Sequence, residues 1–560
     1  MSDFFPAVSS WNCRLFSAAD IPAGAIPDGE KLFLSDGSEV IGEPVFFDGY
    51  GCCDLHDFTG AGLRSPEMRH ILTADFTVTD GGKAVLGCGN DWKMRLFLND
   101  REIFNSLEYG NAEYPVSASN HKILVDLLSG KNSLRAEVFF GGAGAQIAFN
   151  LEKYAAPQLK YGPYLLYPDS YSGEITIAFA TTFPVPAAVE YRKGGERQWH
   201  TVYDNLGGKI RRNAPVHLIR LKNLECDCQY EYRAKLIDTA QNYAELPQES
   251  RFLVIPGRKC CFTATGDLQL PALRKDMLKQ SIAQTPDAGF FAFLGDLCWV
   301  GDFDRNVIGD FTELFREVSG GTLPLVMVRG NHEYYGHDSD RYFEYFSMPE
   351  PGKDSYGIFR IGEVCFFILD CGDDSPRRPA PSVWMLHDIE PFLEAEAKWL
   401  ATAIEHPMCR TAKYRVVLCH GIPLGDPLEY LPGHVRKLID PFFAGKDPVC
   451  KIHLFIGGHV HYPFRSFPGE NCCRTALPEA LHGHPANGGK YYFPVITVSG
   501  PRENLPDGLE QSGIRVQMER EMLEVVSFDR TGREYDRIEI LPDGSVTEIS
   551  SSEFFQKHYY

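Results

Sequence analysis

Carboxylate, amide and imidazole side chains are gathered in five short polar motifs in the second half of the chain, each after an apolar run. In order, the motifs are Gly266-Asp267-Leu268-Gln269, Gly295-Asp296, Gly330-Asn331-His332-Glu333, His420-Gly421 and Gly458-His459-Val460-His461. Groups of these types can bind divalent metal ions or transfer protons. A single Gly-Asp pair is commonly only a turn, because glycine supplies a permissive backbone and aspartate a capping oxygen. The ordered set of five is a much more specific signal.

The stretch from Asp267 to His461 resembles the motif series of the calcineurin-like metallophosphoesterases. The resemblance implies hydrolysis of a phosphate ester at a dinuclear site with two divalent metal ions, which would be Mn, Fe, Zn or Mg. Two such ions about 3.5–4 Å apart activate a water or hydroxide as the nucleophile and clamp phosphoryl oxygens. A bridging carboxylate offsets the repulsion between the ions, and Asp296 matches the family's bridging position.

The same resemblance implies the remaining metal ligands. The first ion would be held by Asp267, Asp296 and His461, with Gln269 as a further candidate. The second ion would be held by Asp296, Asn331, His420 and His459. His459 and His461 are expected to alternate on an extended segment, so their side chains point to opposite sides and can serve different ions. Two carboxylates against two divalent ions leave the site cationic, which attracts a phosphate ester.

Two further histidines are candidate catalytic residues. His332 follows Asn331 and matches the family's histidine that does not bind metal. Its implied role is to donate to a phosphoryl oxygen or to protonate the leaving group, which suits a pKa of about 6.5. His434 is a second candidate to face the substrate, and the alternative is a solvated loop histidine beside Pro432-Gly433.

Two positions depart from the family pattern. Gln269 stands where the family usually has histidine, and an amide oxygen is a weaker and harder ligand than imidazole. Purple acid phosphatases, which this chain resembles in architecture, also lack that histidine but have an iron-binding tyrosine after the bridging aspartate. Trp299 stands at the tyrosine's position, and an indole N–H cannot bind a metal ion. We therefore expect two divalent ions and no iron-tyrosinate colour.

The elements that must position these motifs alternate between apolar strands and amphipathic helices. Strands are expected at 261–265, 290–294, 325–328, 364–369, 415–419 and 453–456, and helices at 271–284, 311–318 and 391–405. This alternation predicts an α/β fold, in which ligands gather at the carboxyl ends of the strands. Residues 257–560 are thus expected to form a metallophosphoesterase β-sandwich flanked by helices.

Two β-rich regions precede this domain, so the fold class is multidomain with an all-β N-terminal part. Residues 1–157 show short alternating runs, such as 92–99 with Met94, Leu96 and Leu98 on one face, and resemble a galactose-binding-like jelly-roll sandwich. Residues 158–256 resemble the fibronectin-III-like sandwich ahead of the catalytic domain in purple acid phosphatases. Pro256-Gly257 is a plausible hinge between that region and the catalytic domain.

Composition limits the partners and the compartment. The formal net charge of −20 argues against non-specific binding of nucleic acid or acidic membranes. No membrane span and no secretory signal are visible, which suggests a cytoplasmic protein, or a periplasmic or secreted one if the N-terminus was trimmed. The 16 cysteines have no framework spacing and are expected to be reduced. Cys226-x-Cys228 is interpreted as two such thiols, with half a metal site as the alternative.

Three functions remain open at this point. The leading hypothesis is a metal-dependent phosphoesterase with a phosphate-ester substrate. The second is a carbohydrate- or surface-binding protein in which the N-terminal sandwich is active and the phosphoesterase domain is degenerate. The third is a catalytically silent scaffold. Metal content separates them, because about two ions per chain favour catalysis and none favours the scaffold.

Overall fold

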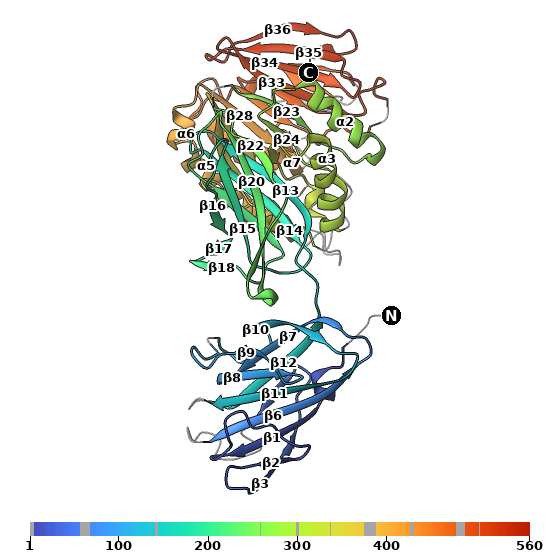
Figure 1. Cartoon of the computed structure of the whole chain (residues 1–560). Helices are drawn as coiled ribbons and strands as arrows, with labels where there is room; N and C mark the ends of the chain where they lie inside the picture. The colour runs from blue at the N-terminus through green and yellow to red at the C-terminus, as the bar shows by residue number, and fades with distance from the viewer. Residues whose placement is uncertain are drawn as a thin grey trace. The chain divides into compact units, whose positions relative to one another are not determined.

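The computed structural model describes two compact units, whose elements are drawn in Figure 1. Unit 1 consists of Met1–Pro157 with Ile237–Leu246, and unit 2 of Gln158–Leu236 with Pro247–Tyr560. The expected regions 158–256 and 257–560 therefore pack as one unit, and the expected hinge at Pro256-Gly257 does not divide compact units. The residues described are 5–55, 68–111, 113–140, 144–257, 259–297, 302–335, 338–373, 388–425, 430–477, 488–502 and 504–559.

Unit 1 is built from two antiparallel sheets around an apolar core. The six-stranded sheet has the order β4 (Glu43–Val45), β1 (Asn12–Ala18), β6 (Arg69–Val78), β11 (Gly130–Phe140), β8 (Trp92–Leu98) and β9 (Arg101–Asn105). The four-stranded sheet has the order β10 (His121–Leu127), β7 (Gly82–Asn90), β12 (Gln146–Lys153) and β5 (Cys52–Asp54). Met94, Leu96 and Leu98 of β8 are buried in the core, which confirms the predicted face. Carbohydrate binding by this unit stays a prediction.

The first large sheet of unit 2 contains strands from both expected regions. Its ten strands run in the order β19 (Val216–Leu221), β14 (Glu174–Thr181), β13 (Leu159–Asp169), β25 (Leu325–Met327), β24 (Phe290–Phe293), β23 (Cys261–Thr265), β33 (Ser512–Glu519), β34 (Met522–Asp529), β35 (Glu534–Ile540) and β36 (Val546–Ser551). β13 pairs in parallel with β25. Strands from both expected domains thus share one hydrogen-bonded sheet.

Two further sheets belong to the same part of the chain. One sheet contains β16 (His200–Tyr203), β15 (Ala187–Lys193), β20 (Gln229–Asp238) and β22 (Arg251–Val254). An eight-stranded sheet has the order β26 (Gly357–Ile361), β27 (Val364–Leu369), β28 (Tyr414–Cys419), β29 (Leu454–Gly457), β32 (Val495–Thr497), β30 (Phe464–Ser466), β31 (Cys472–Thr475) and β37 (Gln556–Tyr559). The strands β27, β28, β29 and β32 are parallel to one another, as are β23, β24 and β25.

The predicted strands and helices of residues 257–560 are present with small shifts of their ends. Helices α2 (Pro271–Gln284), α5 (Ile389–Ala403) and α7 (Tyr430–Phe443) are regular, whereas the predicted helix 311–318 is divided between the π-helix η4 (Asp304–Thr312) and α3 (Glu313–Ser319). None of the helices in the described part of the chain has the length and apolar character needed to cross a membrane.

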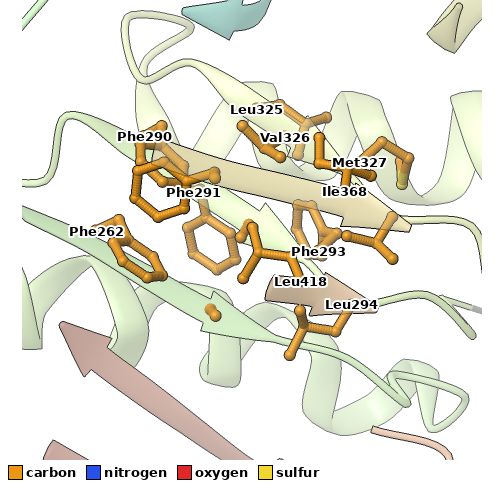
Figure 2. Packing of buried hydrophobic residues seen from close by; sticks show 14 of the residues in the cluster. Phe262, Phe290, Phe291, Phe293, Leu294, Leu325, Val326, Met327, Ile368 and Leu418 are labelled. Carbon is orange, nitrogen blue, oxygen red and sulfur yellow. The ribbon is translucent and has the colours of Figure 1, made fainter. Parts of the chain in front are cut away.

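Consecutive residues of β24 point to opposite faces of the sheet and pack against different layers of the unit. Figure 2 shows this core. The Phe290 ring lies 5.1 Å from the Phe366 ring of the other large sheet. The next residue, Phe291, lies 5.2 Å from the Phe315 ring of α3. Helices cover the outer face of the second sheet as well, where Phe367 packs on Phe443 of α7 at 5.6 Å. Strands covered on both faces must be apolar throughout, which explains their continuous hydrophobic runs.

Candidate metal centre

The five polar motifs meet in space because each follows the carboxyl end of a strand. The motifs of Asp267, Asp296 and Asn331 follow β23, β24 and β25, while His420 and His459 follow β28 and β29. Parallel strands bring their carboxyl ends to one edge of a sheet, and here the edges of the two packed sheets come together. The structure thereby gathers the seven predicted metal ligands in one place.

Two groups of residues have the spacing to hold metal ions. One consists of Asp296, His420 and His459, and the other of Asp267, Asp296 and His461, with the ligand atoms of each group within 4.8 Å of one another. Asp296 belongs to both groups. The two groups are thus joined through a single carboxylate, which is the arrangement that two neighbouring cations require.

In the group around His420, backbone contacts turn the ring atoms inward. His420 Nδ1 lies 2.6 Å from the Leu294 carbonyl oxygen, to which it donates, so Nε2 carries the lone pair. That Nε2 atom lies 2.9 Å from Asn331 Oδ1 and 3.3 Å from Asp296 Oδ2. His459 Nδ1 is 3.1 Å from the same Asn331 oxygen. Four nitrogen and oxygen donors therefore face one point.

Asn331 presents its oxygen to this point because its amide nitrogen is engaged elsewhere. Asn331 Nδ2 donates to the Tyr335 hydroxyl at 3.1 Å. With the nitrogen fixed on that side, Oδ1 must face His420 and His459. An amide oxygen in this orientation is an acceptor and therefore a suitable metal ligand.

The group around Asp267 is built in the same way. His461 Nδ1 lies 3.2 Å from the Pro501 carbonyl oxygen, which leaves Nε2 3.2 Å from Asp267 Oδ1. The Asp267 carboxylate also accepts the backbone N–H of His459 at 3.0 Å. These contacts orient both ligand candidates before any ion binds.

Gln269 completes this group with long contacts. Its Nε2 atom lies 3.4 Å from both Asp296 Oδ2 and His461 Nε2. Its Oε1 atom is buried and has no hydrogen-bond partner. A half-turn of the amide would place this oxygen among the donor atoms, where a metal ion would satisfy it.

The backbone at the centre adopts a conformation that side chains rarely favour. The φ angles are 52° for Asp267, 55° for Asp296, 70° for His459 and 60° for His461, all in the left-handed region. The prediction that His459 and His461 alternate on an extended segment is therefore wrong, because β29 ends at Gly457 and the chain turns twice. The two histidines nevertheless belong to different groups. Left-handed backbone angles at residues other than glycine cost free energy, and they are retained where a functional site requires them.

Glycine allows the two central loops to touch. A Cβ atom on Gly295 would lie 2.6 Å from Gly330 Cα, and a Cβ on Gly330 would lie 2.4 Å from Asp296 Oδ1. Both distances are too short for any real side chain. The glycines beside Asp296 and Asn331 are thus required for the close approach of the loops.

Glu333 holds these loops in register, a role that the sequence analysis did not assign. Its carboxylate accepts the backbone N–H groups of Gly330, Asp296 and Leu297 at 2.8, 2.9 and 3.0 Å. Burial and the nearby Asp296 carboxylate raise the pKa of Glu333 to about 7. The position of Glu333 in the motif Gly-Asn-His-Glu is the sequence signal that points to this role.

The carboxylate and imidazole groups of the centre shift each other's pKa values. Burial lowers the pKa of His420, but Asp296 outweighs it and raises that pKa well above its ordinary value. Burial raises the pKa of Asp296, but His420 and His332 outweigh it and lower that pKa. A proton and a metal ion compete for the same Nε2 lone pair, so metal binding would release a proton.

The two candidate catalytic histidines have different surroundings. His332 lies beside the shared carboxylate, with its backbone N–H 2.9 Å from Asp296 Oδ1 and its Nε2 3.5 Å from Asp296 Oδ2. His434 is on α7, is 7% exposed, and has Nδ1 3.0 Å from the Cys371 carbonyl oxygen. The alternative of a solvated loop histidine is wrong for His434. Trp299 lies outside the described residues.

The donor set fits divalent ions. Carboxylate and amide oxygens together with imidazole nitrogens suit Zn, Mn, Fe(II) and, through the oxygens, Mg. Neither metal group found among the described residues includes Cys226 or Cys228. Their sulfur atoms lie 3.5 Å from the Ser170 carbonyl oxygen and 3.8 Å from the Glu225 carboxylate.

Comparison with known proteins agrees with this centre. Residues 262–463 match the family model of the calcineurin-like phosphoesterases. Members of this family and the related purple acid phosphatases use two divalent metal ions.

Among individual relatives, acid phosphatase type 7 of Mus musculus is 25% identical over 285 residues, which cover 47% of this chain and 59% of the mouse protein. The matched region is thus less than two thirds of that relative. A purple acid phosphatase from seeds of yellow lupin (Lupinus luteus) is 14% identical with a TM-score of 0.46, covering 84% of this chain and 93% of the lupin chain. A dimetal phosphatase from Danio rerio is also 14% identical, with a TM-score of 0.30, and covers 48% of this chain and 96% of its own.

Proposed function

We propose that this protein hydrolyses a phosphate ester at a dinuclear site in which Asp296 bridges two divalent metal ions. The observation that carries the proposal is the membership of Asp296 in both ligand groups. When bound, the two ions would lower the pKa of a water molecule and stabilise negative charge on the phosphoryl oxygens. The calcineurin-like domain and the acid phosphatase among the relatives support the same reaction class.

The residues around Asp296 take distinct roles in this proposal. Asp267, His461 and the Gln269 oxygen would hold one ion. Asn331, His420 and His459 would hold the other, with the His420 ring oriented by the Leu294 carbonyl oxygen. His332 is placed beside Asp296 and would donate a proton to the leaving-group oxygen.

The direct test combines metal analysis with activity. The purified chain is stripped with a chelator, and Mn, Fe(II), Zn or Mg is added back before assays with chromogenic phosphate monoesters and diesters. We expect about two ions per chain and hydrolysis that depends on them. A protein that binds the ions and hydrolyses neither ester class with any metal would contradict the proposal.

A further inference from the structure

The segment Gly500-Pro501-Arg502 follows β32 and lies directly against the metal group of Asp267. A Cβ atom on Gly500 would lie 2.5 Å from Asp267 Cβ and 3.1 Å from the His461 ring. The carbonyl oxygen of the next residue, Pro501, accepts the His461 Nδ1 proton. The chain therefore brings Arg502 to the rim of the centre.

The Arg502 side chain is exposed and is held by only a few contacts. Its Nη1 donates to the Val460 carbonyl oxygen at 3.0 Å, and Val460 lies between the two ligand histidines. Its guanidinium carbon lies 5.0 Å from the centre of the Tyr462 ring. No carboxylate of the described residues forms a salt bridge with Arg502. Most of its N–H donors are therefore available to a ligand.

A second arginine, Arg329, has a different environment from Arg502. It precedes Gly330-Asn331, but it is only 4% exposed and its guanidinium lies 3.5 Å from the centre of the Tyr334 ring. Its Nη1 faces Asp370 Oδ2 at 3.9 Å. Arg329 is thus engaged inside the protein, whereas Arg502 is not.

We infer that Arg502 binds a terminal oxygen of the substrate's phosphoryl group and gives the site a preference for phosphate monoesters over diesters. The inference rests on the proposed function. A phosphate monoester has three terminal oxygens and close to two negative charges at neutral pH, whereas a diester has two such oxygens and one charge. In the proposed site the two ions would take up two terminal oxygens, one for each ion. Only a monoester leaves a third for the guanidinium, whose planar N–H groups match phosphate oxygens.

The experiment compares Arg502→Gln and Arg502→Lys with the wild-type chain. The control is Arg410→Gln, since Arg410 is exposed, pairs with Glu405 at 2.8 Å and precedes β28, whose far end carries His420. β28 spans about 17 Å from Tyr414 to Cys419, and Arg410 precedes the end of β28 that is opposite His420. For each metal-loaded protein, kcat/KM is measured with p-nitrophenyl phosphate and with bis(p-nitrophenyl) phosphate. The Kd of inorganic phosphate is measured by calorimetry.

For Arg502→Gln we expect kcat/KM to fall about 10-fold or more with the monoester and less than about 3-fold with the diester, as a lost charge-assisted hydrogen bond predicts. The phosphate Kd should weaken by a factor similar to the monoester loss. Arg502→Lys keeps the charge without the planar fork and should give an intermediate result, and it serves as the second variant if Arg502→Gln does not fold.

Two results would overturn this inference while leaving the proposed function intact. One is an equal loss with both substrates, which would mean that Arg502 only braces the turn of His459 and His461. The other is an unchanged monoester-to-diester ratio together with an unchanged phosphate Kd. A wild-type chain that hydrolyses neither substrate would instead overturn the proposed function and this inference together.

Discussion

The two ends of strands β28 and β29 place histidines in opposite chemical situations. At the carboxyl ends, His420 and His459 face Asn331 Oδ1 at 2.9 and 3.1 Å. At the amino end of β29, His453 has both ring nitrogens satisfied by the backbone. Its Nδ1 accepts the Arg415 N–H at 3.1 Å, and its Nε2 donates to the Pro542 carbonyl oxygen at 3.0 Å.

The difference appears in the pKa values. Burial lowers the pKa of His453 to about 4, and Arg415 and Lys451 act in the same direction, while the Pro542 hydrogen bond and Asp543 offset only part of the effect. Burial also disfavours a charge on His420, but Asp296 reverses the effect. A buried histidine is therefore structural when backbone groups occupy both nitrogens. It is available for chemistry when one nitrogen is anchored and the other faces carboxylate and amide oxygens.

The substitution with the largest expected effect is Asp296→Asn, which removes the carboxylate common to both metal groups. We expect loss of one or both ions and a fall in activity of at least ~10³-fold, beyond the ~10–100-fold typical of changes outside the ligand shell. Elemental analysis after gel filtration measures the ions. Two tightly held ions in this variant would show that Asp296 does not bridge.

The next effect concerns His332, which lies beside the ligands without being assigned to either ion. His332→Ala should retain both metals and lose turnover by ~10²–10⁴-fold, because a general acid contributes about that much. The loss should be greatest for substrates whose leaving groups have a high pKa. Full kcat with such substrates would refute the role of His332.

Glu333→Gln tests the support behind the ligands and should have a smaller effect. The amide keeps the shape of the side chain, but it cannot replace the carboxylate that accepts three backbone N–H groups. Metal affinity should fall about 10–100-fold, as for other changes next to a ligand shell. Metal titration monitored by calorimetry measures this. Wild-type affinity would mean that the glycine contacts alone hold the loops.

We expect the smallest effect on the metal centre from a change at His453, at the amino end of β29. An unfolded histidine has a pKa of about 6.5, whereas folded His453 has one of about 4, so the folded state resists protonation. His453 thus contributes full stability above pH ~6.5, and about 3 kcal/mol of it is lost as the pH falls toward ~4.

His453→Gln should reduce this pH dependence while metal content at pH 7 stays as in the wild type. Thermal unfolding of the metal-free chain between pH 4 and pH 7 provides the measurement. If the wild-type and variant curves were parallel across this range, His453 would be excluded as the titrating group.

Much of the metal centre could be predicted because its information is local. A run such as 290–293, apolar at every position, predicts a strand covered on both faces, and a polar motif directly after it marks the strand's end. The motifs around Asp267, Asp296, Asn331, His420 and His459 stand out in this way, and their assignment as metal ligands rests on the family resemblance. The helices at 271–284 and 391–405 were found from their periodicity.

Local sequence patterns could not decide whether Pro256-Gly257 is a hinge. A proline-glycine pair indicates a turn but contains nothing about which strands pair across it. The parallel pairing of Leu166 with Leu325 joins residues far apart in the chain, and only the folded sheet contains that information. The extended geometry expected for His459 and His461 failed for a related reason, since the packing of Asp267 against this turn requires left-handed backbone angles.

The sequence by itself thus determined which side chains could bind metal ions and which strand ends would carry them. Tertiary structure alone decided that the Leu294 and Pro501 carbonyl oxygens orient His420 and His461, and that Arg502 lies against the segment of the two ligand histidines. The physical reason is distance along the chain. His420 and Leu294 are separated by 126 positions, and a hydrogen bond between them exists only after two sheets have packed.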